Sequence, residues 1–188
     1  MQSTRTFRAL LASCALALLS ACAQGASAKG MTVTPADLRS APNPALAGAV
    51  AVSEVAGGKD THPLWTSQID DASFHSALVE SLRAVGLLCE KEGAPLALQA
   101  RLVKLDQPFM GFNMTVTSIV HYTVKDARSG ATIIDEDVTA AHTATVGDAF
   151  YGVTRLRLAN EGSARKNIAA LIERLNAIGV TPPAAPST

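Results

Sequence analysis

The chain has 188 residues, the length of one ordinary domain, and its 16 Lys and Arg side chains balance 16 Asp and Glu side chains. Because nucleic-acid binding depends on an excess of basic charge, we do not expect this chain to bind nucleic acid. With 48% hydrophobic and 17% charged residues, it has enough apolar side chains to bury a core, so we expect a folded rather than a disordered protein.

The first residues follow the order of an export signal. Arg5 and Arg8 precede an uncharged apolar run over residues 9–19, as in the basic and apolar parts of a secretory signal peptide. A transmembrane helix needs about 20 apolar residues, and this run is shorter. The sequence therefore predicts a signal peptide here rather than a permanent membrane span.

The signal segment ends in Leu19-Ser20-Ala21-Cys22, which resembles the lipobox of bacterial lipoproteins. In that family a diacylglyceryl group is added to the cysteine thiol, the peptide is cut before the cysteine, and the new amino terminus is acylated. The resemblance implies that residues 1–21 are removed and that Cys22 carries fatty acyl chains such as palmitate, which anchor the protein in a membrane. The alternative is an ordinary secretory signal in which Cys22 is incidental. Cys14 lies inside the apolar run and is the poorer candidate for lipidation.

The residue after the lipidated cysteine indicates whether a lipoprotein stays in the inner membrane or moves to the outer membrane. In the family, an aspartate at this position retains the protein in the inner membrane, whereas here the residue is Ala23. The resemblance therefore implies the outer membrane, with the protein facing the periplasm, and makes the inner membrane less favoured.

Cys89 is the one cysteine that is neither removed with the signal peptide, as Cys14 is, nor modified by lipid, as Cys22 is. No internal disulfide is therefore expected. We interpret Cys89 as a small buried hydrophobe.

Composition divides the mature chain into three parts. Residues 22–44 are rich in Ala, Ser, Pro and Gly and predict a lipidated cysteine followed by a flexible tether. Residues 45–180 carry the periodic apolar patterns of a single folded domain. Residues 181–188 contain several prolines and predict a disordered tail.

Four segments open the folded part. The apolar run over residues 46–55 predicts a strand, and residues 70–86 predict a helix because their apolar side chains recur at helical spacing. Alternation of apolar and polar residues predicts strands over residues 96–103 and 115–124.

The remaining segments complete the predicted fold. A turn at residues 126–130 leads into a strand over residues 132–145, and an amphipathic helix runs from near Val153 to Gly179, with Gly162 as a weak point. The order β-α-β-β-β-α predicts an α+β fold, with an antiparallel sheet of about four strands and two amphipathic helices on one face. In this element order the chain is similar to the small periplasmic domains of envelope lipoproteins.

The last hairpin contains one conflict. Pairing Lys125 with Ala131 places His121 opposite Asp135 and sets Glu136 on the apolar face of the sheet. Three explanations resolve this: the register is off by one residue, a β-bulge intervenes, or Glu136 is buried with a partner. We favour the bulge.

The sequence contains no pattern that carries recognisable chemistry. It has neither HExxH nor CxxC, so no metal or cofactor is expected. The acidic run over residues 135–137 alternates between two faces of a strand and is interpreted as a solubility feature of an edge strand. The glycine pair before Lys59 lacks the spacing of a phosphate-binding loop. We therefore expect no catalytic residues and no enzymatic activity.

Charged and aromatic residues gather near the last helix. The basic residues of its early turns are interpreted as a solvated face; they are Arg155, Arg157, Arg165 and Lys166. Two connections hold most of the few aromatic side chains. We favour slightly that these side chains cap the open end of the core, and the other interpretation is a surface that contacts a partner or lipid. The candidate contact residues are Phe109, Met110, Phe112, Phe150 and Tyr151.

Together these patterns predict a non-catalytic lipoprotein on the periplasmic face of the outer membrane. We expect it to bind the membrane through lipid on Cys22 and to act as a binding or accessory component of a cell-envelope complex, with an envelope protein as partner. One alternative is a carrier of a lipid or small hydrophobic ligand, in which Phe109, Met110 and Phe112 line a pocket. The other is a hydrolase or transferase of envelope substrates, which needs a converging polar cluster.

Overall fold

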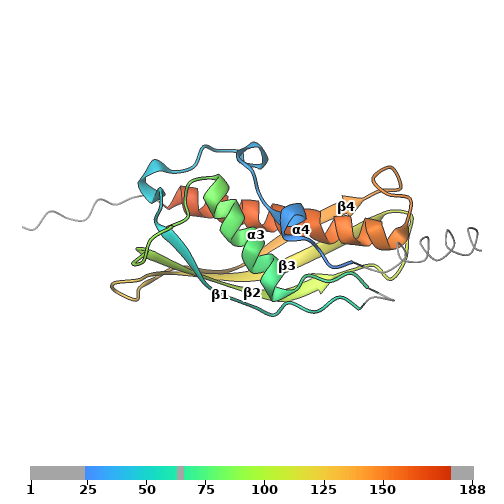
Figure 1. Ribbon diagram of the computed structural model, residues 1–188, viewed down its shortest axis with the longest axis horizontal. Helices are drawn as coiled ribbons and strands as arrows, with labels where there is room; N and C mark the ends of the chain where they lie inside the picture. Colours follow the sequence, from blue (N-terminus) through green and yellow to red (C-terminus); the bar gives the residue numbers. More distant parts are fainter. Residues whose placement is uncertain (1–23, 63–65, 179–188) are drawn as a thin grey trace, which may run out of the picture.

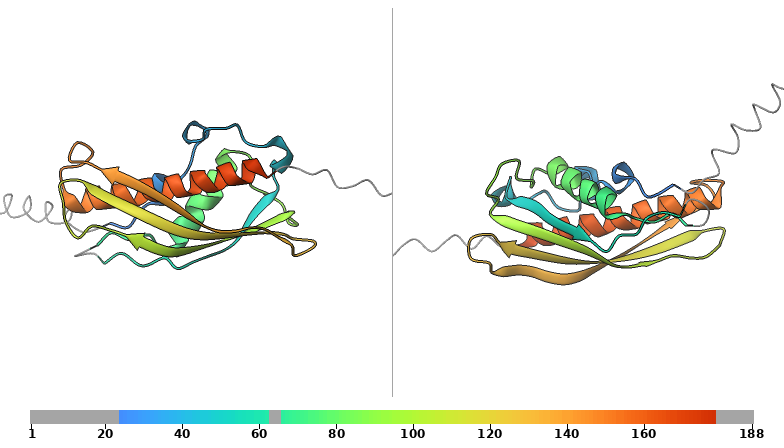
Figure 2. Two further views of the ribbon diagram at one scale, coloured as in Figure 1. Left: turned by 180° about the vertical axis from the view of Figure 1, so that it is seen from behind. Right: turned by 60° about the horizontal axis from the view of Figure 1, so that its bottom comes forward.

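The computed structural model describes residues 24–62 and 66–178. These residues form three layers: a twisted sheet, two helices on one face of it, and an amino-terminal segment laid over the helices (Figures 1 and 2). The predicted signal peptide, Cys22 and the predicted tail over residues 181–188 lie outside the described residues.

The sheet has four strands in the order β1-β2-β3-β4. They are β1 (Val50–Ala56), β2 (Leu96–Asp106), β3 (Met114–Asp126) and β4 (Thr132–Ala144). The predicted α+β fold is confirmed, and β2, β3 and β4 pair antiparallel as expected. The prediction of a wholly antiparallel sheet is wrong for β1 and β2, which are parallel. Their connection carries a helix and is therefore long enough to return the chain to the same end of the sheet.

Helix α3 (Asp71–Ala84) is this crossover helix. Its amino terminus is capped by Asp70, whose Oδ1 accepts a hydrogen bond from the backbone N–H of Ser73 at 2.7 Å. Phe74, Leu78 and Leu82 recur at helical spacing and are fully buried. The predicted helix and its apolar face are confirmed.

Helix α4 (Gly152–Ala177) runs the length of the sheet (Figure 2). It continues unbroken through Gly162, the predicted weak point. A Cβ atom at this position would lie 2.0 Å from Cδ2 of His142 on β4. Glycine therefore leaves room for the imidazole ring between helix and sheet, and this packing offsets its poor helix propensity.

The β3–β4 hairpin contains the predicted bulge, between Val124 and Lys125. Lys125 pairs with Thr132 rather than with Ala131, and after the bulge His121 lies opposite Asp137 rather than opposite Asp135 as expected from the sequence. The one-residue difference at the turn and the extra residue of the bulge together shift each later pair by two residues, so every side chain keeps its expected face.

The bulge does not take Glu136 away from the helix-facing side. Glu136 pairs with Tyr122, which is fully buried on that side. Nε of Arg174 on α4 lies 2.5 Å from Oε1 of Glu136 at the sheet edge. A one-residue register shift at Lys125 and a bulge are therefore both present, whereas Glu136 is exposed rather than buried and has Arg174 as its basic partner.

The flexible tether predicted over residues 22–44 is wrong for the part that the structure describes. From residue 24 onward the chain packs on the helices and contains α2 (Ala28–Met31) and the short 3₁₀ turns η2 (Pro35–Asp37) and η3 (Pro44–Leu46). Met31 and Val33 are 0% exposed, and the backbone N–H of Val33 donates to Oγ of Ser81 on α3 at 2.8 Å. These two apolar side chains anchor a segment made mostly of small residues. We call residues 24–43 the strap.

Candidate functional site

The strongest candidate for a contact surface is one end of the molecule, where five large apolar side chains face solvent. Two come from the β4–α4 loop and three from the β2–β3 loop. They are Phe109 (93% exposed), Met110 (74%), Phe112 (85%), Phe150 (82%) and Tyr151 (71%). The favoured interpretation, that they cap the core, is wrong because a core cap has to be covered. We call these five residues the aromatic end.

Arg155 holds the two loops of the aromatic end together. It lies in the first turns of α4 and is only 7% exposed. Its Nη1 donates to the backbone oxygens of Ala149 at 2.8 Å and Phe150 at 2.6 Å. Its Nη2 donates across to the backbone oxygen of Gly111 at 3.3 Å. One buried guanidinium group thus fixes the backbone behind Phe150 and behind the β2–β3 loop.

The loops stand on an apolar base of their own. A small buried cluster lies beneath them, separate from the main core, and consists of Met114, Val116, Ala144, Leu156 and Ala159. On the surface, the rings of Phe150 and Tyr151 meet edge to face, with centroids 5.6 Å apart. The aromatic end therefore consists of exposed apolar side chains on loops that pack on a buried apolar cluster.

This geometry does not favour the carrier alternative. A carrier has to enclose an apolar ligand, whereas Phe109, Met110 and Phe112 point into solvent. Beneath the helices, the side chains of Leu98, Val120 and other core residues are fully buried by one another.

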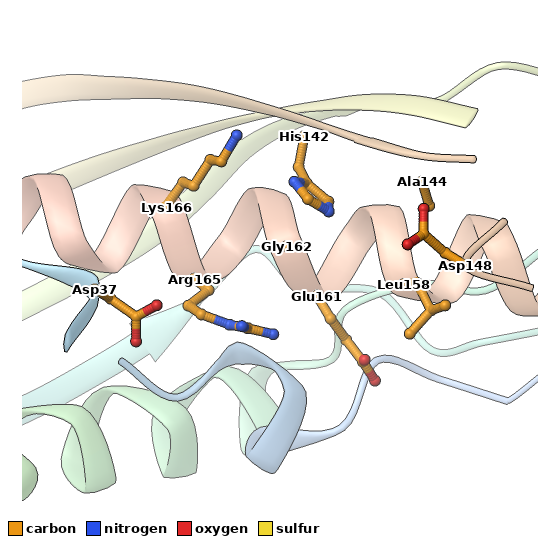
Figure 3. Close-up of a pocket in the computed structure, with 9 residues that line it drawn as sticks. All are labelled: Asp37, His142, Ala144, Asp148, Leu158, Glu161, Gly162, Arg165 and Lys166. Atoms are coloured by element: carbon orange, nitrogen blue, oxygen red, sulfur yellow. The ribbon is translucent and has the colours of Figure 1, made fainter. Parts of the chain in front are cut away.

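A polar cleft of about 220 Å³ lies between α4, β4 and the strap (Figure 3). Its charged side chains point in different directions: Glu161 toward the strap and Lys166 toward β4. Burial lowers the pKa of His142, and the nearby cations of Lys166 and Arg165 act in the same direction. A neutral histidine without a neighbouring nucleophile is not an acid–base pair, so the cleft offers no evident chemistry.

Two of the cleft residues, Glu161 and Arg165, form hydrogen bonds to the strap. Oε1 of Glu161 accepts hydrogen bonds from both N and Oγ of Ser27 at 2.9 Å. Nε and Nη2 of Arg165 donate to the backbone oxygen of Gly30 at 2.9 and 2.6 Å. Glu161 and Arg165 thereby clamp the strap to α4.

The solvated basic face predicted for α4 is therefore wrong for Arg155, which is buried, and for Arg165, which bonds to the strap. Lys166 is exposed, as expected. The sequence shows only basic residues at helical spacing, and it carries no signal that these guanidinium groups serve backbone oxygens of distant segments.

The histidine on the outer face of the sheet lies between two carboxylates. Nδ1 of His121 lies 2.8 Å from Oδ1 of Asp137, and Nε2 lies 3.0 Å from Oδ1 of Asp135. The hydrogen bond to Asp137 raises the pKa of His121 most, and Asp135 adds to it. Within residues 24–62 and 66–178, no three His, Cys, Asp or Glu side chains come together in a way that could hold a metal ion.

A buried polar cluster between α4 and the sheet was not predicted. Ser163 lies 2.8 Å from Ser118 through their Oγ atoms, and Nδ2 of Asn167 donates to the backbone oxygen of Val138 at 2.7 Å. The hydrogen-bond partners of the two serines are backbone groups, an amide and each other. Both serines are fully buried. The cluster therefore joins helix to sheet and presents no activated nucleophile.

Cys89 is half-buried rather than buried as predicted, and its thiol donates to the backbone oxygen of Lys91 at 3.2 Å. It lies just beyond α3, near the start of β1, where its backbone N–H donates to the oxygen of Val50 at 2.8 Å.

None of the helices that the structure describes is both long and apolar enough to cross a membrane. Comparison of the sequence with protein-family models found no match, and comparison with curated proteins found none either.

Several solved structures are similar to this chain at low identity, each with a TM-score below 0.5. Protein XCC0632 from Xanthomonas campestris, of family DUF330, is 11% identical with a TM-score of 0.49, over 72% of this chain and 89% of that chain. A Caulobacter crescentus CB15 protein, provisionally described as a lipoprotein, is 13% identical with a TM-score of 0.46, over 70% and 90%. A PelC variant from Paraburkholderia phytofirmans, a dodecamer, is 20% identical with a TM-score of 0.46, over 73% and 95%. We base the function below on the residues of this chain alone.

Proposed function

We propose that this chain is a non-catalytic lipoprotein on the periplasmic face of the outer membrane. In this proposal, lipid on Cys22 provides the anchor, and the aromatic end provides the surface through which the protein acts as a binding or accessory component of the cell envelope.

The aromatic end is the observation that carries the proposal. Exposed apolar loops are a liability for a protein free in water, and they are kept where they contact something. Ordering such loops costs conformational entropy, and burying the guanidinium group of Arg155 costs desolvation. These two costs are offset if the exposed side chains, including Phe112 and Phe150, bind another component of the envelope.

The lipobox supports the membrane part of the proposal. Leu19-Ser20-Ala21-Cys22 stands at the end of an apolar signal segment, and Ala23 follows it. A diacylglyceryl group together with an amide-linked chain exceeds the two signals that stable anchoring requires, since each buried methylene contributes about 0.8 kcal/mol.

Metabolic labelling with an alkyne analogue of palmitate tests the anchor. The wild-type chain and the control Cys14→Ala are expected to incorporate the label and to sediment with outer membranes on a sucrose gradient. Cys22→Ser is expected to lose the label, and Ala23→Asp is expected to keep it but to move to the inner-membrane fraction. Labelling that survives Cys22→Ser would refute the assignment of the anchor.

A further inference from the structure

The path of the strap shows where the membrane anchor leaves the domain. The strap runs along α4 in the same direction as the helix, so its first residues lie beside the first turns of α4. Nη1 of Arg157 donates to Oε1 of Gln24 at 3.3 Å. Next in order come Ser27 beside Glu161, and then Gly30 beside Arg165.

The later part of the strap continues this order to the other end of the helix. The backbone N–H of Arg39 donates to Oε1 of Glu173 at 2.6 Å, and that of Asn43 donates to Oδ1 of Asn176 at 3.1 Å. Followed backward, the described chain therefore moves steadily toward the start of α4. In Figure 1 it begins, in blue, at the end where α4 begins and where the β2–β3 and β4–α4 loops turn.

The end of the molecule at which the described chain begins is therefore the aromatic end. Arg157, which holds Gln24, is only two residues from Arg155, which holds both aromatic loops. A helix rises about 1.5 Å per residue, so the two arginines differ by about 3 Å in height along α4.

The distance to the anchor is set by covalent geometry. Cys22 stands two residues before Gln24, and two residues of extended chain reach about 7 Å. A domain tied this closely cannot swing freely above the bilayer, in contrast to a domain on a long flexible linker.

We propose that the aromatic end docks directly on the lipid bilayer, with Phe109, Met110, Phe112, Phe150 and Tyr151 in the interfacial region beside the acyl chains on Cys22. The inference rests on the proposed lipidation of Cys22. It names the bilayer as the component that this surface contacts.

The chemistry of the loops fits a lipid surface. Residues 107–113 and 149–154 contain no charged side chain, so entry of the aromatic side chains into the headgroup region desolvates no ion. The β4–α4 loop has one charge, Asp148, whose Oδ2 accepts hydrogen bonds from N and Oγ1 of Thr145. Aromatic rings are the side chains that gather at membrane interfaces, where Tyr keeps its hydroxyl group in water. A protein partner on this surface would have to fit between the domain and the bilayer to which it is tied.

Spin labels at both ends of the molecule test the orientation. In a Cys89→Ser background, the lipidated chain is labelled at Phe112→Cys, Phe150→Cys or, as a control, Ser129→Cys in the exposed β3–β4 turn at the opposite end (Figure 1). Each variant is reconstituted into vesicles of phosphatidylethanolamine and phosphatidylglycerol. Collisions with oxygen and with a water-soluble nickel chelate then report the depth of the label.

We expect the labels at positions 112 and 150 to lie about 5–10 Å within the boundary of headgroups and acyl chains. The label at position 129 is expected to remain in water. If all three labels are in water while the protein floats with the vesicles, docking is refuted and the anchor stands. If position 129 is the immersed site, the orientation is refuted. If the protein does not float with the vesicles, the proposed lipid anchor fails.

Discussion

Replacing Arg155 by alanine is expected to loosen both loops of the aromatic end. The side chain donates two short hydrogen bonds, to Ala149 and Phe150, and a longer one of 3.3 Å to Gly111. Hydrogen bonds to a charged group contribute about 1.5–3 kcal/mol each, so the two short ones represent about 3–6 kcal/mol before costs. Desolvation of the buried guanidinium group reduces this contribution, and within the described chain its Nε has no hydrogen-bond partner.

The net loss on Arg155→Ala is therefore about 2–3 kcal/mol in the free energy of unfolding. Residues 23–188 without lipid serve for the measurement, by urea denaturation followed with far-UV circular dichroism. The matched control is Arg128→Ala in the exposed β3–β4 turn, where a change within about 0.5 kcal/mol is expected.

Hydrogen exchange on the same variants locates the effect. Amide protection in residues 109–113 and 148–152 is expected to fall in Arg155→Ala and to stay unchanged in Arg128→Ala. Equal stability of the two variants, together with unchanged exchange in both loops, would refute the role given to Arg155.

Three further results are expected. Gly162→Ala places a Cβ atom 2.0 Å from Cδ2 of His142 and should cost about 1–3 kcal/mol in thermal or urea unfolding; in a His142→Ala background the same change should instead stabilise by up to about 1 kcal/mol, and a loss in both backgrounds would contradict the packing argument. The hydroxyl group of Tyr122 is buried without a hydrogen-bond partner in the described structure. Tyr122→Phe should therefore leave the free energy of unfolding, measured by urea denaturation, unchanged or raise it by about 1 kcal/mol. A clear loss of stability would show that the hydroxyl group has a partner. Because Asp137 raises the pKa of His121, the stabilisation from this pair is complete below the unfolded pKa of about 6.5 and is lost as pH rises through the higher folded pKa; urea midpoints across this range should show a fall worth about 0.2–1 kcal/mol that is absent in His121→Gln.

The pattern of apolar residues was enough to predict most of the fold. Phe74, Leu78 and Leu82 at helical spacing predicted α3, and alternation predicted β2 and β3, because one face of each element is buried. The turn at residues 126–130 predicted β4. The parallel pairing of β1 with β2 was missed because local patterns carry no information on strand direction.

The strap and the aromatic end were misjudged for a common reason. Composition reports how much apolar surface a segment has and does not report where that surface lies. Residues 24–43 are mostly small, yet Met31 is fully buried between helices. Phe112 and Phe150 are large and apolar, yet they are exposed because Arg155 holds their loops outward. Such tertiary contacts join residues that are far apart in the sequence.

Photocrosslinking in living cells tests the central claim most directly. A photoreactive phenylalanine analogue is placed at Phe112, at Phe150 and, as the control, at Ser129, and the captured material in the membrane fraction is identified by mass spectrometry. We expect phospholipid adducts at positions 112 and 150 and none at position 129. If positions 112 and 150 capture nothing beyond the control while the protein remains membrane-bound through Cys22, the aromatic end is not a contact surface.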